Sequence, residues 1–389
     1  MTKKMILHSV PSLSPRSGGI SSVVSNLAST QINVAPVRAY VISQRNHGEQ
    51  IIESATLANS TYLANANNFM DVSFGISMLR RLNMIIAKDN FSIIHNHGLW
   101  HPANHWTTRV AVRNKIPLVI QPHGMLETWA LNHKAWKKRL AMALYQRSDI
   151  LHANVILATS LDEYYSIRRL GFKQPVAVIP NGVNLTHNSD LTCKRTHIDN
   201  IRTILFLSRV HPVKGLLNLI HAWKQASLDG WRLQIAGPNE NGHLDEIFTL
   251  ARKLSVSDSI EYIGEVGNEQ KAALYRNADL FVLPTHSENF GVVIAEALSF
   301  GTPVITTKGA PWSDLVTYNC GWWIEHGVEP LVEALRSAAA MSDFERYTMG
   351  QRGREYVQRF SWVDIAKQTS DLYSWILNKT EKPDIVMID

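Results

Sequence analysis

The chain has 389 residues, of which 45% are hydrophobic and 19% charged, and its formal net charge is +6. This length is too great for one ordinary hydrophobic core, so we expect two or three domains, and the composition and the interrupted apolar stretches exclude a disordered or membrane-spanning chain. Only two cysteines, Cys193 and Cys320, are present, which favours a cytoplasmic protein without a disulfide framework, and the modest positive charge suits an anionic ligand or membrane surface rather than nucleic acid.

In the first half of the chain, short β-branched runs alternate with helical patterns. Strands are predicted at 5–10, 37–43, 91–97, 116–124, 155–160 and 176–184, and helices among the intervening segments at 20–30 and 134–148. This alternation is typical of a parallel sheet covered by helices. The polar stretch at 185–200 has no periodicity and is the predicted linker.

The same rhythm restarts after the linker. Strands are predicted at 203–208, 232–237, 260–264, 280–284 and 303–307, and helices at 214–228, 243–254, 268–277 and 291–300. The fold class is therefore α/β, with two doubly wound domains whose ligands bind outside the carboxyl ends of the strands, at an edge that we expect to face an inter-domain cleft. The predicted division is 1–184, 185–361 and 362–389, the last a helix over 362–377 and a loosely ordered tail.

Seven residues separate two glutamates, Glu288 and Glu296, in the stretch HSENFGVVIAEALSFGTPVITT. An ionised carboxylate is costly to bury without a partner. Glu288 is predicted just before a helix and Glu296 on it, and the helix start favours an anion. A nucleoside-diphosphate sugar, with hydroxyls at both ends and phosphates between, fits this arrangement. The alternative is a local cap at Glu288 and a solvated helix face at Glu296. The residues of the predicted helix start are Asn289, Phe290, Gly291 and Val292.

Two cations follow the first strand of the second half. Arg209 and Lys214 lie in the segment SRVHPVKG, in a loop that opens a helix at the carboxyl edge of the sheet. Arginine supplies a forked donor for phosphate oxygens and lysine a mobile point charge. The Gly-rich cradle of a Walker loop is missing. The alternative is a pair of solvent-exposed basic residues.

A pair of glycines, Gly18 and Gly19, separates the first strand from its helix. Glycine lets the backbone approach a ligand closely and leaves N–H groups for phosphate or sugar. Without a third spaced glycine, the pair is not a dinucleotide fingerprint.

In chain order, SGGISSVVSNLA, QPHGML, VIPNGVN, SRVHPVKG and the two-glutamate stretch resemble the family 4 glycosyltransferases of GT-B fold. The resemblance covers nearly the whole chain. It implies two Rossmann-like domains, with a final helix that crosses back to the first. It also implies retaining, metal-independent transfer of a hexose-type sugar from a UDP- or GDP-type donor, without a cofactor, to a glycan or lipid-linked glycan. Bacterial surface polysaccharide biosynthesis (O-antigen, capsule or exopolysaccharide) is the implied setting.

The resemblance also assigns residue roles. Arg209 and Lys214 correspond to the residues that hold the donor diphosphate, and Glu296 to the ribose-binding glutamate. Glu288 and His123 correspond to the residues beside the transferred sugar. From its own position after a predicted strand, His123 suits contact with a sugar oxygen or with developing charge. The alternative is a histidine that packs or caps.

Four further histidines, His95, His97, His101 and His105, form an H-x-H…H-x3-H pattern. Neutral imidazoles are common zinc ligands. No Asp, Cys or Glu completes a ligand set at suitable spacing. We therefore predict no metal site.

The segment HKAWKKRLAMALYQR is basic and amphipathic, with an interfacial Trp136. Such a helix can lie on anionic lipid, as a peripheral association with the inner face of the cell membrane. The alternative is a solvated helix face. Its basic residues are Lys134, Lys137, Lys138 and Arg139.

Two other functional classes stay open. One is another GT-B enzyme, such as a sugar-nucleotide epimerase or a phosphorylase, against which the paired glutamates speak. The other is a non-catalytic sugar or lipid binder on the same scaffold, against which the intact cations and glutamates speak.

Overall fold

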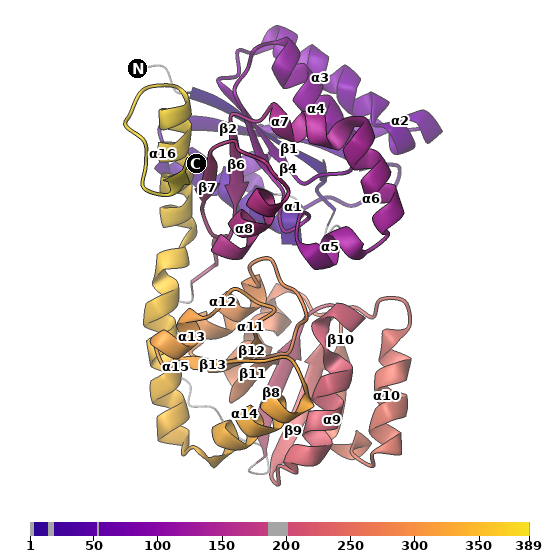
Figure 1. Ribbon diagram of the computed structural model, residues 1–389, viewed down its shortest axis with the longest axis vertical. Coiled ribbons are helices and arrows are strands. Elements are labelled where there is room, and N and C mark those ends of the chain that lie inside the picture. The colour runs from indigo at the N-terminus through magenta and orange to yellow at the C-terminus, as the bar shows by residue number, and fades with distance from the viewer. Residues whose placement is uncertain (1–3, 15–18, 53, 186–200, 389) are drawn as a thin grey trace. The chain divides into compact units, whose positions relative to one another are not determined.

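The computed structural model describes residues 4–14, 19–52, 54–185 and 201–388, which form two compact units (Figure 1). Unit 1 comprises residues 1–182 and 362–389, and unit 2 comprises residues 183–361. The divisions predicted from the sequence fall after residues 184 and 361. The predicted linker lies outside the described residues, apart from Leu185, and so do Cys193 and Gly18.

The described part of unit 1 forms an eight-stranded sheet in the order β14-β7-β6-β5-β4-β1-β2-β3. Neighbouring strands are parallel, except that β14 pairs antiparallel with β7. The strands are β1 (Lys4–Ser12), β2 (Val37–Asn46), β3 (Thr61–Ala66), β4 (Ile93–His97), β5 (Leu118–Gln121), β6 (Val155–Ala158), β7 (Val176–Val178) and β14 (Val386–Met387). The helices are α1 (Gly19–Val34), η2 (Ala55–Leu57), α2 (Phe69–Phe74), α3 (Ile76–Lys88), α4 (Pro102–Arg113), α5 (Thr128–Asn132), α6 (Ala135–Ala141), the π-helix η3 (Met142–Gln146), α7 (Arg147–Leu151), α8 (Leu161–Arg169) and α16 (Trp362–Ile376).

The described part of unit 2 forms a six-stranded parallel sheet in the order β10-β9-β8-β11-β12-β13. The strands are β8 (Arg202–Leu207), β9 (Trp231–Ala236), β10 (Ile260–Gly264), β11 (Leu280–Leu283), β12 (Val304–Thr307) and β13 (Gly321–Ile324). The helices are η6 (Pro212–Lys214), α9 (Leu216–Ala226), α10 (His243–Lys253), η7 (Ser257–Ser259), α11 (Asn268–Asn277), α12 (Val292–Ser299), α13 (Asp314–Thr317), α14 (Val328–Ala340), α15 (Asp343–Val357) and η8 (Gln358–Phe360).

The sheet of unit 1 is buried on both faces, as expected when helices cover a parallel sheet. Alternate residues of β1 belong to different clusters: Ile6 packs with α1 and α16, whereas Leu7 packs with α3 and α4. The final helix α16 packs along α1. Because side chains alternate along a strand, His8 lies on the same face as Ile6, toward α1 and α16.

Some local predictions were incomplete or wrong. The predicted helix at 134–148 is helical from Ala135 onward, as α6, η3 and α7, but its middle is a π-helix. The tail, expected to be loosely ordered, contains β14, because Val386 buries its side chain beside Tyr373 of α16. The strands β3 and β13 were missed. Among the described residues, no helix has both the length and the apolarity that a bilayer crossing needs.

Candidate active site

Three neighbouring strands of unit 2, β8, β11 and β12, end at one edge of the sheet, and the loops that follow them are joined by hydrogen bonds. The Thr285 hydroxyl donates to the carbonyl of Val213 at 3.1 Å, and the N–H of Glu288 donates to the carbonyl of Gly309 at 2.7 Å. A Cβ at Gly309 would overlap the carbonyl of Thr285. The loop that carries Glu288 is therefore fixed from both sides.

Lys214 and Glu288 form an ion pair at this edge. The Lys214 ammonium lies 2.5 Å from Glu288 Oε2, and the lysine side chain is only 7% exposed. The turn after Lys214 depends on Gly215, whose φ is +72° and whose Cβ would overlap the carbonyl oxygen of Pro284. This geometry contradicts the alternative in which Lys214 is solvent-exposed and Glu288 merely caps the helix.

Glu296 lies on α12 and is held by two partners from α11. The ammonium of Lys271 lies 2.5 Å from Oε1, and the hydroxyl of Tyr275 donates to Oε2 at 2.9 Å. Burial and the neighbouring carboxylate raise the pKa of Tyr275 well above its usual range, so this phenol stays a donor. The alternative of a solvated helix face is wrong for Glu296, whose side chain is 19% exposed.

The start of α12 separates the two glutamates in the sequence. Gly291 precedes the helix with a φ of +78°, a region that favours glycine, and Val292 is the first helical residue. Phe290 is buried, and its carbonyl accepts a hydrogen bond from the Trp312 indole. The first N–H groups of a helix have no intrahelical acceptor, so this end suits an anion.

Arg209 makes a contact that the sequence analysis did not anticipate. Its guanidinium donates to both carboxylate oxygens of Glu240, at 3.0 and 2.9 Å, and half of the arginine side chain is exposed. The predicted diphosphate contact of Arg209 would therefore require it to exchange this carboxylate for phosphate oxygens.

His123 lies in a tight turn after β5 of unit 1. Its φ is +54°, and the N–H of the next residue, Gly124, donates to Glu163 Oε1 at 2.5 Å. The other oxygen of the fully buried Glu163 accepts from the N–H of Thr159 at 2.8 Å and from its hydroxyl at 3.0 Å. Burial raises the pKa of Glu163, although these three hydrogen bonds act in the opposite direction. The turn is thus anchored by a carboxylate that the sequence analysis missed.

The glycine pair is only half described. Gly19 is the first residue of α1, and a Cβ there would meet nothing within 4 Å. Packing with the described residues therefore does not require glycine at this position. Donor binding by Gly18 and Gly19 stays a prediction.

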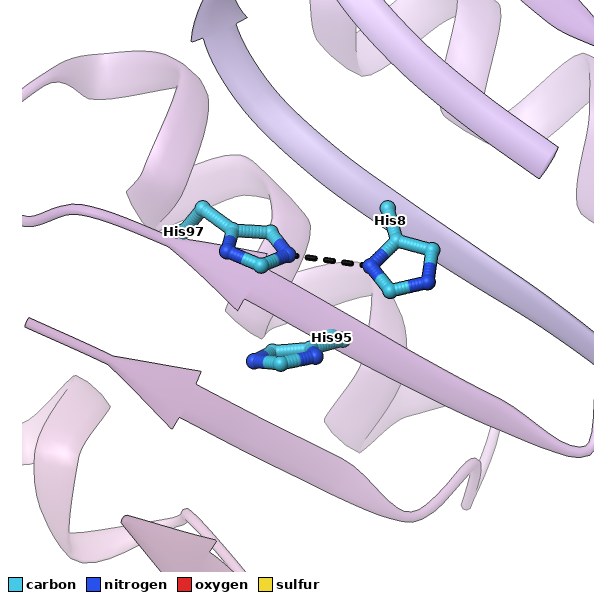
Figure 2. Close-up of side chains that lie close together, drawn as sticks. All are labelled: His8, His95 and His97. Atoms are coloured by element: carbon cyan, nitrogen blue, oxygen red, sulfur yellow. Dashed lines mark hydrogen bonds between the residues drawn. The ribbon is translucent and has the colours of Figure 1, made fainter. Parts of the chain in front are cut away.

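Among the described residues, one cluster of side chains could hold a metal ion. It consists of three buried histidines of unit 1, His8, His95 and His97, which have ring nitrogens within 4.8 Å of one another (Figure 2). Nδ1 of His8 and Nε2 of His97 already share a hydrogen bond of 3.0 Å. The rings of His95 and His97 stack with centroids 4.0 Å apart, at an interplanar angle of 27°. Stacked rings direct their in-plane lone pairs side by side, not toward one point. We interpret the cluster as a hydrogen-bonded stack.

The other two histidines of the H-x-H…H-x3-H pattern have local roles. The His101 ring accepts a hydrogen bond from the N–H of Ala103 and caps α4. His105 lies 2.9 Å from Asp149. In the described structure, the pattern does not converge on one site.

The basic segment forms α6 and η3 and exposes large apolar side chains. Trp136 is 68% exposed and Leu144 71%. The ammonium of Lys137 lies 5.5 Å from the centroid of the Trp136 ring, and that of Lys138 donates to the carbonyl of Ala130. Apolar and basic groups therefore share this surface.

Comparison with known proteins supplies the family. Residues 17–187 match the model described as Glycosyltransferase Family 4, and residues 193–356 match the model described as Glycosyl transferases group 1. The chain is 32% identical over 303 residues to the D-inositol 3-phosphate glycosyltransferase of Corynebacterium efficiens, covering 73% of this chain and 71% of that protein. The chain belongs to glycosyltransferase family 4. The predicted family is confirmed, and the protein is a glycosyltransferase.

Solved structures share the fold of this glycosyltransferase. Anabaena Alr3699/HepE in complex with UDP and glucose matches with a TM-score of 0.76 at 19% identity, covering 96% of this chain and 100% of that one. WaaG, a glycosyltransferase involved in lipopolysaccharide biosynthesis, matches with a TM-score of 0.68 at 15% identity, covering 95% and 99%. The predicted GT-B fold class, with two Rossmann-like α/β units, is confirmed.

Proposed function

We propose that this glycosyltransferase transfers a hexose-type sugar, with retention of anomeric configuration, from a UDP- or GDP-type sugar donor to a glycan or lipid-linked glycan. The observation that carries the proposal is a pair of lysine-bound glutamates on either side of the start of α12. Glu288, bound by Lys214, precedes the first helical residue, and Glu296, bound by Lys271, follows it. A nucleoside-diphosphate sugar has a diphosphate between two groups rich in hydroxyls. Carboxylates suit its ends and the helix start suits its centre.

In the proposed reaction, the bond between the anomeric carbon and the diphosphate oxygen breaks, and a bond to the oxygen of an acceptor hydroxyl forms. The proton of that hydroxyl passes to the leaving diphosphate. Negative charge grows on the leaving diphosphate, and Lys214, Arg209 and the helix start would stabilise it without a metal ion. Glu296 would bind the ribose hydroxyls. Glu288 and His123 would contact the transferred sugar.

The names of similar proteins support this proposal. The relative from Corynebacterium efficiens is named D-inositol 3-phosphate glycosyltransferase, and Alr3699/HepE was solved with UDP and glucose. WaaG is described as involved in lipopolysaccharide biosynthesis. We extend these chemistries to a nucleotide-sugar donor and to an acceptor of O-antigen, capsule or exopolysaccharide type.

The donor is tested first by thermal shift with UDP-, GDP- and ADP-sugars, because a ligand that binds the folded state raises its melting temperature. Turnover with an acceptor is then compared between wild type, Glu288→Gln and Glu325→Gln. Glu325 is a matched control, since it pairs with Lys308 of the same unit but is 65% exposed. We expect Glu288→Gln alone to lose turnover.

Three results would contradict the transferase proposal as a whole. They are the absence of any shift with all sugar nucleotides, equal turnover in both variants, and conversion of the donor without an acceptor, which would indicate an epimerase. An anomeric proton coupling that differs between donor and product would refute retention. Loss of turnover in chelator, restored by a divalent cation, would refute metal independence.

A second proposal concerns the surface of α6, defined by Lys134, Lys137, Lys138, Arg139 and Trp136. We propose that it binds anionic membrane lipid, because exposed apolar and basic side chains occur together there. Flotation with phosphatidylglycerol-containing vesicles compares wild type with a variant in which Lys137, Lys138 and Arg139 are Glu.

The control for this flotation carries the same charge change on exposed residues of unit 2, with Lys224, Arg252 and Lys253 replaced by Glu. We expect only the α6 variant to stop floating. Equal flotation of both variants would remove the membrane proposal and leave the transferase proposal intact.

A further inference from the structure

A line of four hydrogen-bonded side chains runs through unit 1 to His123. Oε1 of Gln31, on α1, lies 2.8 Å from Nε2 of His8. Nδ1 of His8 lies 3.0 Å from Nε2 of His97 (Figure 2), and Nδ1 of His97 lies 3.1 Å from Nε2 of His123. The first three side chains are fully buried. The line therefore ends at the one partly exposed member, His123.

Each imidazole of this line is neutral near pH 7. Burial lowers the pKa of His8 to about 4 and that of His123 to about 3, and it holds the pKa of His97 well below its usual range. A neutral imidazole has one N–H and one bare nitrogen, so within the line each ring donates once and accepts once. All the hydrogen bonds must then run in the same direction, and the end group decides which.

The end group is the amide of Gln31. In the orientation that the structure gives this amide, its carbonyl oxygen faces His8 and its buried Nε2 has no hydrogen-bond partner. A carbonyl oxygen only accepts, so in this orientation His8 carries its proton on Nε2 and accepts at Nδ1 from His97. His97 in turn accepts at Nδ1 from His123.

We propose that Gln31 and His8 are positioning residues that hold His123 as its Nε2–H tautomer and leave Nδ1 bare to accept a hydrogen bond from a hydroxyl of the transferred sugar. The sugar part of this inference rests on the proposed function; the tautomer part does not. Among the described residues, none makes a hydrogen bond to Nδ1 of His123. The ring is fixed through His97 on one side and through the anchored turn at Gly124 on the other.

A fixed acceptor has a consequence for specificity. A ring nitrogen without a proton accepts a hydrogen bond from a sugar hydroxyl. A sugar that lacks the hydroxyl at that position makes no such bond. A tautomer free to switch would accept or donate and would discriminate less. Through the histidines, the orientation of the Gln31 amide thus determines that His123 accepts a hydrogen bond at Nδ1. This acceptor favours a sugar that has a hydroxyl there.

The tautomers are read directly by nuclear magnetic resonance on the full-length chain labelled with ¹⁵N-histidine, with single-histidine variants for assignment. We expect His8, His97 and His123 to be Nε2-protonated at pH 7.5. We also expect scalar couplings across the hydrogen bonds, with His97 Nε2–H as donor to His8 and His123 Nε2–H as donor to His97. Nδ1 protonation of His123, or absence of the couplings, would overturn the inference. No sugar nucleotide is needed, so this result is independent of the proposed function.

Binding then tests the consequence, with UDP-glucose and UDP as probes, or GDP-mannose and GDP if only the guanine pair binds. His8→Leu removes the acceptor for His97, whereas His8→Asn places an amide oxygen near the position of Nδ1 and can keep it. We expect His8→Leu to weaken the sugar nucleotide roughly 3- to 10-fold, the worth of about one hydrogen bond, and to leave the nucleoside diphosphate unchanged. His8→Asn should recover most of this loss.

Gln31→Met supplies an independent variant if His8→Leu does not fold, and Gln44→Met is its control, because Gln44 is also buried in unit 1 but outside the line. We expect Gln31→Met, and not Gln44→Met, to reproduce the selective loss. Equal weakening of sugar nucleotide and diphosphate, or no weakening in either His8→Leu or Gln31→Met, would overturn the positioning role. If none of the sugar nucleotides binds the wild type, the transferase proposal fails and the tautomer assignment still stands or falls by the resonance result.

Discussion

The buried histidines should make unit 1 sensitive to acid, and His8 offers a way to measure one share of this effect. Its pKa is about 4 in the folded chain, against an ordinary value of 6.5. Because folding lowers the pKa, the stabilisation is complete above about pH 6.5 and is lost as the pH falls toward 4, where the unfolded chain binds the proton and the folded chain does not. Linkage with these two values gives a loss of about 2 kcal/mol at pH 5 from His8 alone.

The variant His8→Asn removes this titration. The free energy of opening of unit 1 should fall in both proteins when the pH is lowered from 8 to 5. We expect this fall to be about 2 kcal/mol smaller in the variant than in wild type. The measurement is peptide-resolved hydrogen exchange, corrected for the intrinsic rate at each pH, on peptides that contain β4. Peptides that contain β8, in unit 2, serve as the internal control. An identical pH-dependent loss in both proteins would refute the reasoning that burial keeps His8 neutral.

Three further predictions concern unit 2. Gly215→Ala should lower the free energy of unfolding, measured in urea, by about 3 kcal/mol, because the new Cβ overlaps a carbonyl and the φ is strained. Gly230→Ala, at a φ of +74° with open space around it, should lower it by only about 1 kcal/mol. Equal losses in the two variants would contradict this. Tyr275→Phe removes a donor to the predicted ribose-binding carboxylate and should weaken UDP or GDP roughly 10-fold by calorimetry, an unchanged affinity being the contrary result. Glu240→Gln weakens the hold on Arg209 and should tighten the same nucleotide by about two- to fivefold, and weaker binding would count against a diphosphate role for this arginine.

Much of the fold could be predicted from the sequence because buried parallel strands are continuous apolar runs. The run FSIIHNH predicts a strand that ends at His97, where β4 ends. The missed strand β3 has the sequence TYLANA, in which polar residues break the apolar run. The π-helix within 134–148 was missed because its residues keep a helical pattern while the hydrogen-bond spacing changes. The local sequence pattern therefore predicts that a helix or strand exists better than it predicts the hydrogen-bond spacing within it.

The candidate site was predictable only for residues that directly follow predicted strands. Lys214 follows a strand and Glu288 follows another, so the rule for carboxyl ends places both at one edge. The partners of Glu296 were missed because Lys271 and Tyr275 come from α11, whose packing against α12 depends on the three-dimensional fold. Their spacing of four, which puts both on one helix face, was the only local signal.

The histidines show why strand order decides the chemistry of a motif. From the sequence alone, the H-x-H of β4 suggested zinc ligands without a complete ligand set, because the neighbours of β4 were unknown. In the structure β1 lies beside β4, with His8 in register with His95, and α1 covers that face with Gln31. His8 supplies an acceptor to His97. Because of this acceptor, the hydrogen bonds from His123 through His97 to His8 all run in one direction. A hydrocarbon side chain at position 8 would leave His97 and His123 free to exchange their proton positions. The side chains that select the tautomer, Gln31 on α1 and His8 on β1, therefore lie outside the strand that carries the motif.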